Sequence, residues 1–160
     1  MTPQEIILDR GNAKYKLKDY SGAIADFNKS IELNPKSAYS YEQRGNAKYE
    51  LKDYYGAIDD YSMTIKLGFE YCYIYNERGL AKIKVQDYYG AIADSYKASE
   101  LDPKSASSYN LRGCAKDGLN DYSGAIADYN KAIELYPQYG TAYYNRGVVK
   151  NKTGDRTGAL

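Results

Sequence analysis

Apolar side chains recur at intervals of three and four residues, in short segments separated by polar residues, glycine and proline. This spacing places apolar side chains on one face of an α-helix. Residues 38–51 and 55–67 show it most clearly, and the second segment makes a helix of about 20 Å. The helix faces are formed by Tyr41, Gly45, Lys48 and Leu51 in the first segment and by Ala57, Ile58, Tyr61, Thr64, Ile65 and Leu67 in the second. The pattern therefore predicts two short amphipathic helices in succession.

The helix pair repeats along the chain with a constant period. The dipeptide Arg-Gly returns every 34 residues, and Gly-Ala-Ile follows in the same register. The marking positions are Arg10, Arg44, Arg78, Arg112 and Arg146, then Gly22, Gly56, Gly90 and Gly124, with Gly158-Ala159-Leu160 as the fifth instance. A fixed period of this kind is the signature of a repeat protein. We predict one repeat domain over 1–160, with full repeats 4–37, 38–71, 72–105 and 106–139 and a partial repeat 140–160.

Polar residues at the expected helix ends agree with this division. Residues 2–5 (Thr-Pro-Gln-Glu) form a capping box with proline at the first helical position. Ser37 and Ser105 are expected to cap the first helices that follow them. The second helices are expected to be capped by Asp19, Asp53, Asp87 and Asp121. The second repeat lacks a closing proline, so we expect the turn around Gly68 to be the least regular.

Three motifs carry a family resemblance. Gly-Asn-Ala-Lys-Tyr, Asp-Tyr-Ser-Gly-Ala-Ile and Ile-Glu-Leu-Asn-Pro occur in this order within 34 residues and resemble the tetratricopeptide repeat, over residues 4–160. The resemblance implies an all-α fold in which antiparallel helix pairs stack into a right-handed superhelical solenoid. It also implies that the first helices line a concave groove, and that the protein binds proteins or peptides or serves as an assembly scaffold.

The composition argues against catalysis. The chain contains 21 Tyr and no His. The absence of His excludes Ser-His-Asp and Cys-His nucleophile activation, His-based metal sites and His acid–base catalysis. Scattered carboxylates such as Glu42 and Glu77 have no nucleophile or metal partner in the pattern. We therefore expect a protein that is not an enzyme and that needs no cofactor or metal.

The charge balance narrows the choice of partners. Lys and Arg number 22 against 21 Asp and Glu, a net charge of +1, so no general field attracts nucleic acid or anionic lipid. No apolar stretch approaches the roughly 20 residues that span a bilayer. Cys72 and Cys114 are too few for a disulfide framework and suit a reducing compartment. We expect a cytoplasmic protein whose partner is neither nucleic acid nor membrane.

Residue types that recur in every repeat are interpreted as structural. The Arg column, matched by an acidic column on the second helices, favours ion pairs within the chain over a ladder for an acidic partner. The glycines of the Gly22 column are expected to allow the close approach of a neighbouring Tyr. Two Tyr columns are expected to pack in the core or between repeats. These columns are Asp26, Asp60, Asp94 and Asp128; Tyr41, Tyr75, Tyr109 and Tyr143; and Tyr20, Tyr54, Tyr88 and Tyr122.

The remaining variable positions on the first helices form the candidate site. The resemblance implies that Asn12 and Asn46 hydrogen-bond the backbone of an extended peptide, and an amide side chain offers both a donor and an acceptor for this. Five irregular tyrosines fall on the same face. The predicted peptide-binding residues are Asn12, Tyr15, Tyr39, Glu42, Asn46, Tyr49, Tyr73, Asn76, Leu80, Asn110 and Tyr144.

The charge of this face predicts the type of ligand. The resemblance implies that the subfamily that binds acidic chaperone tails needs cations in a column which here reads Leu8, Glu42, Asn76, Asn110 and Tyr144, so such tails are not expected to bind. A mildly acidic, Tyr-lined face favours a neutral-to-basic peptide with apolar or aromatic anchors. Two alternatives stay open: the face is merely solvated, or the chain is a structural unit that assembles end to end into homo-oligomers.

Overall fold

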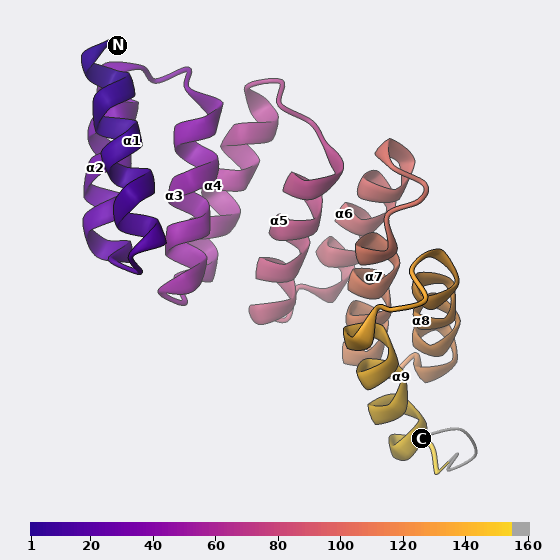
Figure 1. Cartoon of the computed structure of the whole chain (residues 1–160). Helices are drawn as coiled ribbons and strands as arrows, with labels where there is room; N and C mark the ends of the chain where they lie inside the picture. Colours follow the sequence, from indigo (N-terminus) through magenta and orange to yellow (C-terminus); the bar gives the residue numbers. More distant parts are fainter. Residues whose placement is uncertain (155–160) are drawn as a thin grey trace. The chain divides into compact units, whose positions relative to one another are not determined.

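A computed structural model describes residues 1–154, and within this range the chain is entirely helical outside its turns. Figure 1 shows the succession of helices along the chain. The helices are α1 (Pro3–Lys16), α2 (Tyr20–Leu33), α3 (Ala38–Glu50), α4 (Tyr54–Lys66), α5 (Cys72–Lys84), α6 (Tyr88–Leu101), α7 (Ala106–Gly118), α8 (Tyr122–Leu135) and α9 (Gly140–Lys152). The all-α, paired-helix fold predicted from the sequence is confirmed. The predicted motif at 158–160 lies outside the described residues.

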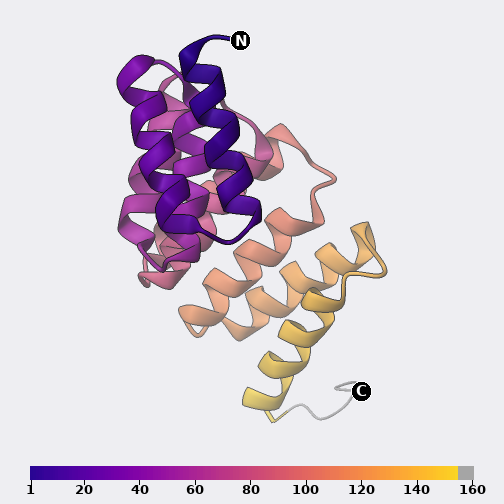
Figure 2. The same ribbon diagram turned by 60° about the vertical axis from the view of Figure 1, so that its left-hand side comes forward.

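The chain divides into two compact units, which we describe separately. Unit 1 is Met1–Glu70 and contains α1 to α4; unit 2 begins at Tyr71 and contains α5 to α9. Within each unit, every helix packs against its neighbour in the chain, and each first helix also contacts the next first helix. Figure 2 shows the antiparallel course of consecutive helices. Each unit is thus a stack of helix pairs in which the first helices form one face.

Local capping explains where the helices begin. Thr2 Oγ1 accepts from the Glu5 backbone N–H and the Glu5 carboxylate accepts from Thr2, so the capping box is confirmed. Each predicted Asp cap accepts from the backbone N–H three residues later at 2.9–3.0 Å. Ser105 caps α7 through Ser108, whereas Ser37 makes no side-chain cap bond, so that part of the prediction was wrong. Ser37 instead bonds the hydroxyl of Ser40.

The same caps correct the expectation for the glycines of the Gly22 column. A Cβ atom at Gly22 or Gly56 would lie within 2.2 Å of the carboxylate of the preceding cap, Asp19 or Asp53. No Tyr is among the three nearest contacts at these positions. The prediction of a close Tyr was therefore wrong. The capping carboxylate folds back over the first turn of the helix and occupies the space that a side chain would need.

A second glycine column lies where the two helices of a pair touch. Gly11, Gly45 and Gly113 contact an aromatic ring from the second helix of their own repeat, at 2.6–2.8 Å from the position that a Cβ atom would take. These fully buried rings are Phe27, Tyr61 and Tyr129. In repeat 3 the ring is replaced by Ser95, and Gly79 instead contacts Leu111 of α7. A side chain at Gly11, Gly45 or Gly113 would overlap an aromatic ring of the core, whereas one at Gly79 would meet the flexible end of Leu111.

The turn after α4 is the irregular one, as expected. Gly68 has a φ angle of +88°, which an L side chain rarely adopts, and α4 ends at Lys66. The other second helices end one residue later in their repeats. The residue that follows each of them has an extended backbone. The boundary between the two units follows this turn.

Candidate functional site

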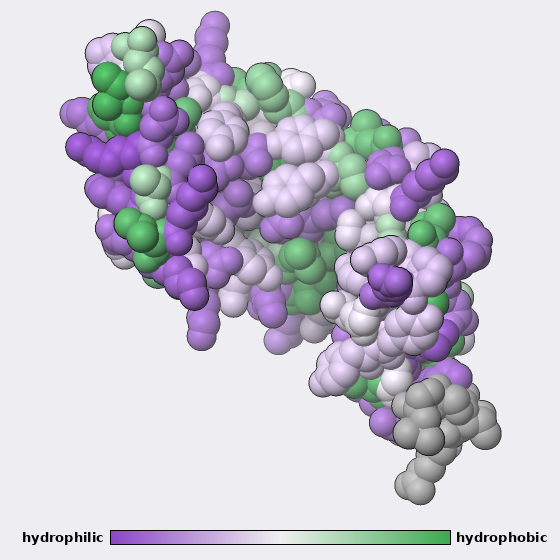
Figure 3. All heavy atoms as spheres, viewed as in Figure 1, coloured by the Kyte–Doolittle hydropathy of each residue, from purple (hydrophilic) through white to green (hydrophobic). Residues whose placement is uncertain are grey.

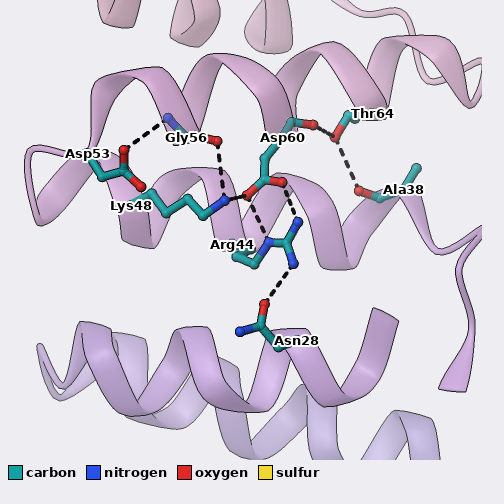
Figure 4. Close-up of polar contacts among 8 residues, drawn as sticks. All are labelled: Asn28, Ala38, Arg44, Lys48, Asp53, Gly56, Asp60 and Thr64. Atoms are coloured by element: carbon teal, nitrogen blue, oxygen red, sulfur yellow. Dashed lines mark hydrogen bonds and ion pairs between the residues drawn. The ribbon is translucent and has the colours of Figure 1, made fainter. Parts of the chain in front are cut away.

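Four arginines of the Arg column each pair with an Asp of their own repeat and do not form a ligand ladder. The fifth, Arg146, donates to Asn130 of the preceding repeat at 2.6 Å. In repeat 2, Arg44 Nε and Nη2 donate to the two carboxylate oxygens of Asp60 at 2.9 and 2.6 Å. Lys48 Nζ lies 2.8 Å from Asp60 Oδ2 and also donates to the Gly56 carbonyl (Figure 4). The same Arg–Asp–Lys clamp occurs at Asp26, Asp94 and Asp128. The predicted intramolecular Arg–Asp pairs are confirmed, and the lysines are a further partner that the sequence had not indicated.

A Tyr column supports the clamps from within the same helix. The Arg44 guanidinium lies 5.3 Å from the centroid of the Tyr41 ring, and corresponding pairs occur in the following repeats at 5.1–5.4 Å. This spacing of one helical turn gives a cation–π contact. The column was expected to pack in the core or between repeats, and Tyr75, which is 5% exposed, lies in the core, whereas Tyr143 is 44% exposed and does not. The rings of this column also lie beside the arginines one helical turn further along.

In unit 1 the predicted site residues are largely engaged with the protein itself. Asn46 Oδ1 accepts a hydrogen bond from Tyr61 at 2.9 Å. Tyr15 and Tyr49 make edge-on contacts with Tyr20 and Tyr54, each with ring centroids 5.3 Å apart. The half-buried Tyr20 and Tyr54 thus pack against tyrosines of the first helices.

Three further predicted residues of unit 1 differ in exposure. Asn12 is half-buried, and its Oδ1 has no hydrogen-bond partner among the described residues. Tyr39 is exposed, and Glu42 is half-buried on the same helix, α3. Among its predicted site residues, unit 1 therefore presents one exposed aromatic ring and one unsatisfied amide oxygen, whereas Tyr15 and Tyr49 pack against other tyrosines.

Unit 2 contains a cavity of about 480 Å³ between the first helices. Its walls come from α5 and α7, with contributions from the turn after α6 and from the residue before α9. Four predicted site residues, Tyr73, Asn76, Leu80 and Asn110, lie in the lining. The full lining is Cys72, Tyr73, Asn76, Glu77, Leu80, Asp102, Ser107, Asn110, Leu111 and Tyr139. Tyr144 lies outside this lining and is 73% exposed.

The amide side chains of the cavity are buried and partly satisfied. Asn76 is 6% exposed, and its Nδ2 donates to Ser107 Oγ at 2.9 Å and to Cys72 Sγ at 3.5 Å. Its Oδ1 is buried and has no partner among the described residues. Asn110 Oδ1 accepts from Asn145 Nδ2 at 3.1 Å. The amide groups are therefore held in place by their neighbours, while one acceptor is left without a donor.

The electrostatics of the cavity are acidic. Glu77 and Asp102 belong to its lining, and the lining contains neither Lys nor Arg. Burial, and then the nearby Cys114 thiol, raise the pKa of Tyr139, so its hydroxyl is neutral at physiological pH. Burial also raises the pKa of Cys114. The negative charge of the site thus comes from the two carboxylates alone.

The site residues predicted from the sequence do not include six residues of the lining, which are Cys72, Glu77, Asp102, Ser107, Leu111 and Tyr139. Asp102 directly follows the last residue of α6, and Tyr139 lies at the boundary between repeats. A signal was present in one column: the residue before the first helix alternates between Ser and Tyr along the repeats. This column reads Ser37, Tyr71, Ser105 and Tyr139. Tyr cannot cap a helix as Ser does, so the Tyr residues before α5 and α9 indicate a role other than capping at this position.

The rest of the described surface offers little competing chemistry. Figure 3 shows hydrophilic side chains mixed with pale aromatic rings, and only small hydrophobic patches on the face in view. Within residues 1–154, no group of three or more Cys, Asp or Glu side chains could hold a metal ion. None of the helices in that range combines the length and the apolar character that a membrane span requires. The cavity of unit 2, which brings together four predicted site residues, is the candidate site.

Comparisons with known proteins identify the family. The TPR repeat family matches residues 11–52 and 119–154. The TPR domain of Arabidopsis OM64 is 30% identical, with 72% of this chain and 95% of that domain covered and a TM-score of 0.68. This chain belongs to the tetratricopeptide-repeat family, whose members are protein–protein interaction scaffolds and generally not enzymes.

Two further solved structures are similar. MamA from Desulfovibrio magneticus RS-1 is 19% identical, with 99% of this chain and 90% of that chain covered and a TM-score of 0.89. The second TPR domain of human RPAP3, solved in complex with the HSP70 peptide SGPTIEEVD, is 26% identical, with coverages of 71% and 94% and a TM-score of 0.66. A comparison with curated protein sequences finds no match.

Proposed function

We propose that this protein is a non-enzymatic interaction scaffold that binds a neutral-to-basic peptide, or an extended segment of a partner protein, on the first-helix face of unit 2. The observation that carries the proposal is the acidic cavity between α5 and α7, which holds two buried amide side chains. Ligand sites in proteins have volumes of about 300–1,000 Å³ and combine apolar walls with a few fixed polar groups. Leu80 and Leu111 provide such walls here, and Asn76 and Asn110 provide the polar groups.

The charge of the cavity supports a ligand unlike the one bound by RPAP3. The HSP70 peptide SGPTIEEVD in that complex contains two Glu and one Asp. Glu77 and Asp102 would repel such a peptide because like charges brought together in a partly desolvated site cost free energy. A peptide with Lys or Arg gains from the same carboxylates, and the exposed Tyr73 offers an aromatic face.

A peptide selection tests the proposal. Random twelve-residue peptides are displayed and selected on the intact protein, and the affinities of selected peptides are measured by fluorescence anisotropy. We expect enrichment of basic and aromatic residues, and at least tenfold weaker binding to Asn110→Leu. Tyr89→Ala is the control because Tyr89 is 76% exposed and lies outside the cavity. Enrichment of acidic peptides, or equal binding to both variants, would contradict the proposal.

Light scattering on the same samples separates the proposal from self-assembly. A peptide scaffold keeps its oligomeric state when Asn110 is replaced. Concentration-dependent growth of particles, in the absence of any selected peptide, would instead favour end-to-end association of repeat units.

A further inference from the structure

We propose that the cavity of unit 2 is an arginine pocket, which takes the guanidinium side chain of an Arg in the bound segment. The inference rests on the proposed function, because it assigns one side chain of the ligand to one place on the first-helix face. It goes further in committing to a single chemical group, and three features of the cavity carry it: its hydrogen-bonding capacity, its charge, and its pairing of tyrosines with carboxylates.

The lining contains one buried acceptor that has no donor, together with two carboxylates. Asn76 Nδ2 is already used by Ser107 and Cys72, whereas Asn76 Oδ1 has no donor among the described residues. Glu77 and Asp102, when ionised, can only accept. Asp102 Oδ1 accepts from the Lys104 backbone N–H, but a carboxylate has about four acceptor positions. A donor from the ligand would satisfy the buried Asn76 Oδ1, and the guanidinium group brings five donors and no acceptor.

The charge of the lining selects a cation. Two carboxylates and no basic residue surround a space that is closed on several sides by Leu80, Leu111 and the Asn side chains. A cationic side chain is attracted by these carboxylates, whereas an anionic one is repelled by them. The apolar walls suit the methylene stem of a long basic side chain, which packs along apolar surface while its charged end pairs.

The protein already holds guanidinium groups with the same combination of residues. The Arg112 guanidinium lies over the rings of Tyr96 and Tyr109, at 4.6 and 5.1 Å from their centroids, and pairs with the Asp128 carboxylate. The cavity provides the same elements, two tyrosines and carboxylates, in the form of Tyr73, Tyr139, Glu77 and Asp102. A planar guanidinium can stack on a Tyr ring and form paired hydrogen bonds at once, which the compact ammonium of Lys cannot do. This favours Arg over Lys.

The test uses small probes, so that it does not depend on a known peptide. The intact ¹⁵N-labelled protein is titrated with N-acetyl-arginine amide, N-acetyl-lysine amide and N-acetyl-citrulline amide, and amide shifts are followed by NMR. Citrulline has nearly the shape of Arg but no charge and fewer donors. We expect saturable shifts at Asn76, Asn110 and Tyr139 with the arginine probe, at a Kd in the range of about 1–10 mM. The lysine probe should bind several-fold more weakly, and citrulline should not saturate.

Two variants and a matched control connect the binding to the carboxylates. Glu77→Gln and Asp102→Asn keep the side-chain shape and should each weaken the arginine probe about tenfold. Glu50→Gln removes an exposed carboxylate on α3, outside the cavity, and should leave binding unchanged. Unaltered far-ultraviolet circular dichroism verifies that each variant is folded; if one carboxylate variant does not fold, the other decides.

The outcomes separate this inference from the proposed function. Equal shifts with all three probes, no shift up to the solubility limit, or shifts outside the cavity would overturn the arginine assignment. Lysine binding as tight as arginine would overturn it too. If selected peptides bind the first-helix face without Arg and compete with none of the probes, the scaffold function stands and the arginine pocket fails. If no peptide is selected but the arginine probe saturates, the pocket stands and the peptide function fails.

Discussion

Repeat 2, in unit 1, and repeat 3, in unit 2, place the same glycine in the same position and fill the space beside it differently. In repeat 2, Gly45 contacts the ring of Tyr61, which belongs to the second helix of the same repeat. In repeat 3 the corresponding residue is Ser95, and Leu111 from the first helix of the next repeat contacts Gly79 instead. Repeat 2 builds this part of its core within the repeat, and repeat 3 builds it between repeats.

The difference shows which parts of the repeat are free to change. The Arg–Asp–Lys clamp and the Asp cap are the same in both repeats, because every helix pair needs them. The residue that corresponds to Leu111 is Gln43 in repeat 2 and is half-buried there. In unit 2, Leu111 both fills the core and lines the cavity. Beside Gly79, Leu111 takes the place that an aromatic ring has beside Gly45. The residue that completes the core there therefore also lines the candidate site.

The largest effect is expected when the exchanged residue is truncated. Leu111→Ala should lower the free energy of unfolding by about 3 kcal/mol, because it leaves a cavity beside Gly79 that Ser95 cannot fill. Gln43→Ala, at the same position in the repeat, should cost less than about 0.5 kcal/mol. Urea denaturation followed by circular dichroism at 222 nm measures both. Equal losses in the free energy of unfolding would mean that Leu111 contributes no more to the core than Gln43 does.

A smaller effect is expected when a clamp is weakened. Asp94→Asn should cost about 2 kcal/mol, because the Arg78 and Lys82 side chains are only 17% and 16% exposed and lose their charged partner. Asp26→Asn should cost clearly less, since the Arg10 side chain is 62% exposed and water can replace the carboxylate. The midpoints of thermal unfolding rank the two variants. A greater loss for Asp26→Asn would contradict the burial argument.

The smallest effect separates the two ways of filling the space beside the glycine. A Cβ atom at Gly45 would meet the ring of Tyr61, whose hydroxyl is fixed by a bond to Asn46. At Gly79 the clash is with the end of Leu111, a flexible side chain beside a cavity. Gly45→Ala should therefore destabilise the protein by about 1 kcal/mol more than Gly79→Ala. Chemical denaturation of both variants provides the comparison, and the reverse order would show that Leu111 is the more rigid contact.

Much of the fold followed from the 34-residue register, since periodicity assigns each residue to a helix, a face and a cap. The Arg10–Asp26 type of pair was predictable because both columns are constant. The role of Gly22 was not, because capping by Asp19 and packing by a Tyr are both compatible with glycine at that position. The site was predicted in part: Asn76 and Asn110 lie on a helix face that the register defines. Asp102 and Tyr139 lie in the turns after α6 and before α9. The periodicity of the sequence does not predict the path of a turn, so their position in the cavity was not predicted.

The most direct test of the account is to map a bound peptide onto the structure. A selected peptide is added to the ¹⁵N-labelled protein, and shifts are compared between the first and second helices of unit 2. The account predicts that the largest shifts lie at Tyr73, Asn76, Asn110 and Tyr139, with little change along α6 and α8. Largest shifts on α6 and α8, or on unit 1 alone, would contradict the claim that the first-helix face of unit 2 is the binding site.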